Sequence, residues 1–252
     1  MAEPDFELSL ARSAEDLRAA QRLRYEIFVQ ELGGGGAMVD HDNRLEIDRF
    51  DPFFDHLLLR DRSRDHAVVG VYRLLRCDQA RAAGQFYSED EYDLSVLRQS
   101  GRKLLELGRS CLHADYRGGA AMYHLWGGLA DYVAEHGIEI LFGTASFHGA
   151  DPEAHADALS LLYQRHLAPE DLRVTARPEA RAEMNRVQES ELDRKAAMLK
   201  IPALIKAYLR LGGVVGDGAW IDRAFNTTDV CLVMDTARMN QRQRALYERD
   251  RG

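Results

Sequence analysis

The segment from residue 104 to residue 147 restricts the fold most, because a helical run lies between two strand-like runs. LLELGRSCLH begins at Leu104, AAMYHLWGGLADYVAEHG follows a Gly-Gly turn, and IEILFGTASF ends at Phe147. The flanking runs are apolar over the length of a strand, whereas the middle run repeats its apolar residues at helical spacing. This order predicts a strand, a helix and a second strand within an α/β domain.

The other segments continue this alternation of strands and helices. Phe6–Ala11 alternates like a strand, and Ala14–Leu32 has a helical apolar face that ends at four glycines. Further expected elements are strands over 55–61 and 66–76, a loop with a short helix over 86–100, helices over 152–167 and 177–213, and a strand over 230–235. The order indicates one domain over 1–252 with a mixed central sheet flanked by helices, a helical elaboration over 150–212 and C-terminal strands.

Composition excludes several classes of protein. The 252 residues carry a net charge of −8, which argues against a general nucleic-acid binder. Three cysteines without paired spacing predict neither a disulfide framework nor a zinc site, and they fit a reduced cytoplasmic setting. The acidic N-terminus lacks a signal-peptide pattern, and no apolar run reaches the roughly 18 residues of a membrane span. We therefore expect a cytoplasmic protein.

The run LLELGRSCLH carries an acid and a base three residues apart. Glu106 lies among leucines, so burial would desolvate its carboxylate and suit it to act as a general base for an amine. Gly108 permits a β-bulge, which would turn a backbone N–H toward a reacting carbonyl oxygen. A structural ion pair between Glu106 and Arg109 is the alternative interpretation.

The glycine turn after this run and a later tyrosine are also candidates. Arg117, Gly118 and Gly119 precede a helix, where backbone amides can bind a phosphate. A plain connection between strand and helix is the simpler explanation. Tyr163 lies in a helical run after the second strand, where its hydroxyl could protonate a leaving thiolate or could only reach the surface of the core.

One acidic loop brings three carboxylates together. Glu46, Asp48 and Asp51 suit an ammonium group or a metal, although a solvated loop has the same composition. His41 between two aspartates hints at a metal, but it has no matching second cluster. We predict no metal site.

Several of these motifs together resemble the acyl-homoserine lactone synthases, which are GNAT-like enzymes that take acyl groups from acyl carrier protein (ACP). The residues that carry this resemblance are Arg24, Phe28, Glu46, Asp48, Phe50, Asp51, Gly70, Arg73, Glu106 and Arg109. The chain resembles more closely the ornithine–acyl-ACP N-acyltransferases, a family also labelled hemolysin-like. That resemblance rests on RYEIFVQELG, FYSEDEYDLS, ELGRSCLHADYRGGAA, HLAPEDLR and IPALIKAYLRLGGVVGDGAWIDRAFNTTDV, and it covers nearly the whole chain.

The resemblance implies a GNAT-like fold and transfer of a 3-hydroxyacyl chain from ACP to the α-amine of L-ornithine, which gives lyso-ornithine lipid. It implies that Glu106 is the catalytic base and Tyr163 the acid, with no tightly bound cofactor. The implied substrate-binding residues, with an arginine for the acceptor carboxylate and an acid for its ammonium group, are Arg24, Phe28, Glu46, Asp48, Asp51, Arg73 and Arg109. The implied donor-binding residues are Cys111, Leu112, Arg117, Gly118 and Gly119, with the thiol of Cys111 as a packing group.

The glycine turn departs from the loop of acetyl-CoA-dependent GNAT enzymes, which runs Arg/Gln-x-x-Gly-x-Gly/Ala. Here Ala120 or Ala121 stands at the second glycine position, and a side chain there narrows backbone access to a pyrophosphate. Pantetheine on ACP carries one phosphate and needs less room. The departure therefore favours acyl-ACP over coenzyme A as the co-substrate.

A basic segment indicates a partner surface. Residues 173–210 hold nine Lys or Arg against five acids, so this part of an acidic chain would attract ACP or the anionic face of the inner membrane. An amphipathic helix that covers its own core with snorkelling lysines is the alternative. Two other functions stay open: an acyltransferase with a lysine, glutamine or homoserine-type acceptor, and a non-catalytic protein that binds acyl-ACP or lipid.

Overall fold

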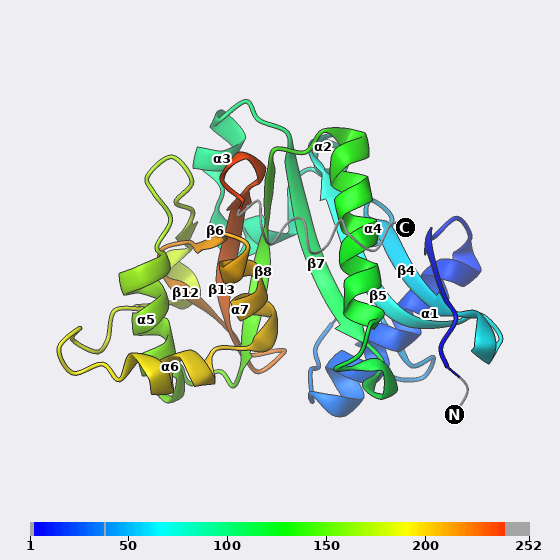
Figure 1. Ribbon diagram of the computed structural model, residues 1–252, viewed down its shortest axis with the longest axis horizontal. Helices are drawn as coiled ribbons and strands as arrows, with labels where there is room; N and C mark the ends of the chain where they lie inside the picture. Colours follow the sequence, from blue (N-terminus) through cyan, green and yellow to red (C-terminus); the bar gives the residue numbers. More distant parts are fainter. Residues whose placement is uncertain (1–2, 38, 240–252) are drawn as a thin grey trace. The chain divides into compact units, whose positions relative to one another are not determined.

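A computed structural model describes residues 3–37 and 39–239 and divides the chain into two compact units (Figure 1). Of the described residues, unit 1 contains those up to Gly84 and Leu107–Gly137. Unit 2 contains Gln85–Glu106 and the described residues from Ile138 onward. Each unit has its own sheet strands and helices.

Unit 1 is built on strands that the apolar runs of the sequence predicted. Strand β1 (Phe6–Leu10) pairs with β4 (Asp55–Asp61), and β4 pairs with β5 (Ala67–Arg76), both in antiparallel fashion. Strand β7 (Leu104–Leu112) lies next to β5 and contributes its residues from Leu107 onward to this unit. The strands predicted over 6–11, 55–61, 66–76 and 104–113 are therefore confirmed to within one or two residues.

Helices cover both faces of the unit 1 strands. Helix α1 (Ala14–Arg24) packs Ala20 and Leu23 against Leu58 of β4. Helix α4 (Ala121–His136), drawn in green in Figure 1, approaches the other face, where its Gly128 leaves room for Leu57. Successive strand residues point to opposite faces, so one strand supplies a core residue to each helix.

The first helix differs from the prediction in its last two turns. We expected one uninterrupted helix to Leu32, but α1 ends at Arg24 and continues as a π-helix, η1 (Tyr25–Glu31). A π-helix joins residues five positions apart, whereas an α-helix joins residues four apart. The N–H of Leu32 accordingly donates to the carbonyl oxygen of Ile27 at 3.1 Å. The apolar residues of a π-helix recur at nearly the same spacing as those of an α-helix. The sequence alone therefore does not distinguish the two.

Unit 2 contains the parallel part of the mixed sheet. The first three residues of β7, Leu104–Glu106, pair in parallel with the start of β8 (Ile140–His148). Along its whole length β8 pairs antiparallel with β13 (Thr227–Asp235). The next strand across the sheet is β12 (Ala219–Asp222), which pairs antiparallel with β13. The predicted mixed sheet with C-terminal strands is confirmed.

The helices of unit 2 are shorter than the sequence predicted. Helix α5 (Ala156–His166) confirms the helix expected over 152–167. The segment 177–213 was expected to be largely helical, and this is wrong for residues 177–193, where β10 (Arg181–Ala182) pairs with β12. Helices form only afterwards, as α6 (Arg194–Lys200) and α7 (Ala203–Arg210).

Two residue types explain these boundaries. Asp193 caps α6 by accepting hydrogen bonds from the N–H groups of Lys195 and Ala196, and Pro202 separates α6 from α7.

The remaining short elements are β2 (Val39–Asp40), β3 (Leu45–Glu46), η2 (Arg62–Arg64), α2 (Cys77–Ala83), η3 (Tyr87–Asp90), β6 (Tyr92–Asp93), α3 (Ser95–Gln99), η4 (Ala114–Tyr116), η5 (Pro152–His155), β9 (Thr175–Ala176), η6 (Pro178–Ala180), β11 (Val214–Val215) and η7 (Thr236–Arg238). Within the described residues, no helix combines the length and apolar character needed to cross a bilayer.

Candidate active site

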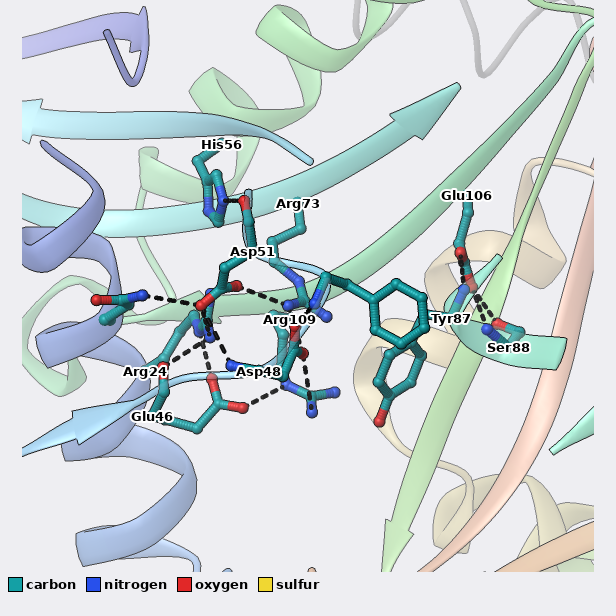
Figure 2. A network of polar contacts seen from close by, with 12 residues as sticks. Arg24, Glu46, Asp48, Asp51, His56, Arg73, Tyr87, Ser88, Glu106 and Arg109 are labelled. Carbon is teal, nitrogen blue, oxygen red and sulfur yellow. Dashed lines mark hydrogen bonds and ion pairs between the residues drawn. The ribbon is translucent and has the colours of Figure 1, made fainter. Parts of the chain in front are cut away.

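Unit 1 contains a buried cluster of charged side chains (Figure 2). Its members come from α1, from β3 and the loop behind it, from β5 and from β7. They are Arg24, Glu46, Asp48, Asp51, Arg73 and Arg109. The sequence named all six as substrate-binding residues, and the structure brings them together.

The carboxylates of the cluster are held by arginines. Arg24 is fully buried, and its Nη1 lies 2.7 Å from Asp51 Oδ1 while its Nε donates to the carboxylate of Glu46. Arg73 Nη1 bridges two acids, at 2.6 Å from Asp48 Oδ2 and 2.8 Å from Asp51 Oδ1. These contacts join residues between 22 and 27 positions apart, so they fix the acidic loop to a helix and a strand.

Arg109 completes the cluster from β7. Its Nε lies 3.1 Å from Glu46 Oε1, and its guanidinium carbon is 6.0 Å from the ring centroid of Phe28. Its φ of 49° is left-handed, which is unusual for a side chain of this size. The strand irregularity that the sequence predicted at Gly108 therefore falls on the neighbouring residue, whose side chain belongs to the charged cluster.

The electrostatics of the cluster favour charged groups despite burial. Burial would raise the pKa of Glu46, but the charges of Arg109 and Arg24 lower it below its ordinary value. In the same way Arg73 holds the pKa of Asp48 down, and Arg24 holds the pKa of Asp51 well below its usual range. Three positive and three negative side chains thus neutralise one another inside the unit.

Glu106 lies in unit 2 and has a different environment. It is 1% exposed, and its carboxylate accepts hydrogen bonds from one turn, η3. The N–H of Tyr87 donates to Oε2 at 2.8 Å, and the N–H of Ser88 donates to Oε1 at 2.6 Å. The hydroxyl of Ser88 donates to the same Oε1 (Figure 2). The predicted burial of Glu106 is confirmed, and the donors that η3 supplies are neutral groups.

Sequence reasoning did not assign a function to this turn, although its residues belong to FYSEDEYDLS. Glu89 Oε2 accepts the N–H of Phe86 at 2.7 Å, which closes the turn. Arg98 Nη1 lies 2.7 Å from both oxygens of Glu89. The spacing of Phe86, Glu89 and Arg98 was visible in the sequence, but the turn's contact with a strand 18 residues away was not.

The donor-binding residues predicted after Glu106 lie on β7 and in the turn before α4. Arg117 is engaged within unit 1, because its Nη2 lies 2.7 Å from Glu31 Oε2 and its Nε donates to Leu112 O at 3.1 Å. Gly118 has a left-handed φ of 77° at this turn. Burial raises the pKa of Cys111 to about 12, so its thiol stays neutral, as expected for a packing group.

Two further predictions have structural counterparts. Tyr163 lies half-buried on α5 in unit 2. His41 Nδ1 lies 3.1 Å from the hydroxyl of Tyr25. Among the described residues, carboxylates within 4.8 Å of one another occur elsewhere, at the buried Glu91 and Asp229 and the half-buried Asp222.

The basic segment 173–210 is largely occupied by internal contacts. Four of its cations form ion pairs, namely Arg181, Arg186, Arg194 and Lys200. Arg173 and Arg177 donate to backbone carbonyls. Across residues 3–37 and 39–239, no ion pair involves Lys195, Lys206 or Arg210. The surface that an acidic partner could use is therefore smaller than the sequence predicted.

Comparison with known proteins agrees with this geometry. The acetyltransferase (GNAT) domain family matches residues 23–127. An N-acyl amino acid synthase from uncultured soil microbes, FeeM, has a TM-score of 0.54 at 12% identity and covers 93% of each chain. The CoA-dependent acyl-homoserine lactone synthase BjaI has a TM-score of 0.52 at 15% identity, covering 94% of this chain and 82% of its own. The protein therefore has a GNAT-like fold, as the sequence predicted.

Curated relatives define the family. L-ornithine N(alpha)-acyltransferase of Rhodobacter capsulatus is 57% identical over 248 residues, which are 97% of this chain and 95% of the relative. The enzymes of that name from Brucella abortus and Rhizobium meliloti are 41% and 40% identical, over 96% and 98% of this chain and 88% and 86% of their own lengths. The chain belongs to the L-ornithine N(alpha)-acyltransferase family.

Proposed function

We propose that this chain transfers a 3-hydroxyacyl group from acyl-ACP to the α-amine of L-ornithine, giving lyso-ornithine lipid. The acceptor rests on the name of the relative that is 57% identical over nearly the whole chain. The observation that carries the chemistry is the buried carboxylate of Glu106, which neutral donors orient on β7.

In the proposed reaction the α-amine attacks the thioester carbonyl, so that a C–N bond forms and the C–S bond breaks. Glu106 accepts the proton of the attacking nitrogen, directly or through water. A backbone N–H near the left-handed Arg109 donates to the developing oxyanion. Tyr163 protonates the leaving pantetheine thiolate, which completes the proton balance.

We propose that the buried cluster shapes the acceptor site. Among its arginines, Arg109 keeps the largest exposed side-chain fraction, 14%, against 0% for Arg24 and Arg73. Arg109 is therefore our choice for the acceptor carboxylate, because bidentate guanidinium–carboxylate pairs give both energy and orientation. Glu46 and Asp48, which adjoin Arg109, are the choice for the acceptor ammonium.

The donor is proposed to bind along the later part of β7 and the turn before α4. The parallel ladder between β7 and β8 covers only Leu104–Glu106, so later residues of β7, including Cys111 and Leu112, make no part of it. Because Glu31 already engages Arg117, we propose that backbone groups at Gly118 and Gly119 contact the single phosphate of pantetheine. No tightly bound cofactor is needed.

Purified protein, 3-hydroxyacyl-ACP and L-ornithine provide the test, with product mass as readout. With acyl-ACP as donor, we expect a product with the mass of N-acylated ornithine. With the coenzyme A thioester of the same acyl chain, we expect much less of this product. If product formed only with lysine, glutamine or a homoserine derivative, that amine would be the acceptor in place of ornithine. Binding of acyl-ACP without any product would support a non-catalytic role and overturn the proposal.

We further propose two contacts for α6 and α7 in the cytoplasm. Lys195, Lys206 and Arg210 receive the acidic carrier, while Leu199, which is 73% exposed, contacts the cytoplasmic face of the inner membrane that takes the lipid product. Replacing the three cations by Glu should weaken ACP binding, most at low salt. Leu199→Glu should reduce sedimentation with anionic vesicles without changing ACP binding.

A further inference from the structure

We infer that Ser88 is a positioning residue for catalysis, because it holds the carboxylate of Glu106 in one orientation. This inference rests on the proposed role of Glu106 as general base. Ser88 is 1% exposed and directs both its N–H and its hydroxyl to Oε1 of Glu106. A serine with this contact is a candidate for function, since most buried hydroxyls bond to backbone groups.

Without such contacts, the side chain of a glutamate does not fix the orientation of its own carboxylate. Rotation about its last side-chain bond has broad minima, so a base on a strand needs external groups to aim its oxygens. Ser88 and Tyr87 supply donors to different oxygens, Oε1 and Oε2, which fixes that rotation. Hydrogen bonds from donors of this kind favour the charged form of a carboxylate over its neutral form.

The turn that carries Ser88 is itself fixed on both sides. Arg177 donates from its backbone N–H to Glu91 O at 2.8 Å and from Nε to Glu89 O at 2.6 Å. The ring of Phe86 packs edge-on against Phe142, with centroids 5.0 Å apart. Phe142 is the ladder partner of Glu106. The donors and the acceptor are therefore anchored to the same residue of β8, which limits relative movement.

A cysteine thiol is one titratable group in the electrostatic environment of Glu106. Cys231 on β13 interacts electrostatically with both Glu106 and Glu91. Burial raises the pKa of Cys231, so the thiol stays neutral. Ser88 is one of the groups in unit 2 that donate hydrogen bonds to the buried carboxylate of Glu106.

The test measures the pH dependence of kcat for transfer to L-ornithine in the full-length protein. Ser88→Ala should lower kcat about tenfold near neutral pH, the effect of losing one hydrogen bond to a charged group. It should also move the acid limb of the profile upward by about one pH unit, because the ionised base loses a donor. Ser88→Thr keeps the hydroxyl and should return the limb toward its original position.

The matched control is Ser160→Ala. Ser160 is also buried in unit 2 and makes hydrogen bonds, donating to Met184 O and accepting the N–H groups of Arg186 and Val187. The Ser160→Ala substitution should lower the thermal midpoint of unfolding, as Ser88→Ala does. It should leave the acid limb of the kcat profile in place. An unshifted limb in Ser88→Ala, with Glu106→Gln inactive, would overturn the inference alone. A wild-type rate for Glu106→Gln would overturn the base assignment as well.

Discussion

The two units hold buried carboxylates in opposite ways. In unit 1, Glu46, Asp48 and Asp51 are neutralised by arginines at 2.6 to 3.1 Å. In unit 2, Glu106 is held by the N–H groups of two successive residues and one hydroxyl. Both arrangements direct hydrogen-bond donors to buried carboxylates, and the donors of the first carry a full positive charge.

The difference bears on which buried acid can act as a base. A carboxylate paired with a guanidinium is a weak base, because protonation would leave the cation without its partner. A carboxylate held by neutral dipoles can take up a proton without leaving a buried cation unpaired. This contrast supports our proposal that Glu106 accepts the proton of the attacking amine.

The largest expected effect comes from the catalytic carboxylate. Glu106→Gln should reduce kcat by roughly 10²- to 10⁴-fold, the usual contribution of a general base, while circular dichroism and ACP binding stay unchanged. Glu46→Gln is the comparison, because it should lower the stability of the fold by leaving buried arginine charge. If the two variants lost activity and stability in the same proportions, the distinction between the two regions would fail.

The next effect concerns stability of the cluster. Arg73→Met should lower the free energy of unfolding by about 3–5 kcal/mol, because it leaves Asp48 and Asp51 buried with one cation fewer. Urea unfolding measures this change. The matched control is Arg62→Met, which removes an exposed ion pair to Asp5 and should leave the unfolding midpoint unchanged. Equal effects of the two substitutions would contradict the buried-network interpretation.

Acid should weaken the cluster next. The folded-state pKa values of Glu46, Asp48 and Asp51 lie below their ordinary values, so these groups stabilise the fold above about pH 4 to 5 and lose that contribution as pH falls. The unfolding midpoint in urea, measured from pH 7 to pH 3, should drop below about pH 5. A flat profile over this range would mean that the arginines do not lower these pKa values.

The smallest effect tests the backbone at Arg109. Both Arg109→Gly and Arg109→Ala remove the ion pair to Glu46, but only glycine adopts a left-handed φ of 49° without strain. We expect the glycine variant to be more stable than the alanine variant by about 1 kcal/mol in thermal or urea unfolding. A more stable alanine variant would indicate that this conformation depends on the arginine side chain.

The sequence was most informative about the sheet strands and about which residues carry charge in the site. Runs such as DHLLLRD and VCLVMD predicted strands that the structure confirms, because alternation and apolar content act over a few residues. It was least informative over residues 177–193, where high charge resembled a solvated helix. There the pairing of β10 with β12 decided the outcome, and it joins residues 37 and 39 positions apart along the chain.

The sequence by itself determined the family, the long strands of the sheet, and the identity of the acids and arginines. The tertiary structure decided which of them pair: Arg24 with Glu46 and Asp51, and Glu106 with the turn at Ser88. Residue identity and local periodicity are encoded along the chain, whereas the partner of a buried carboxylate depends on which elements pack together. Only that packing separates acids neutralised by arginine from the acid held by neutral donors.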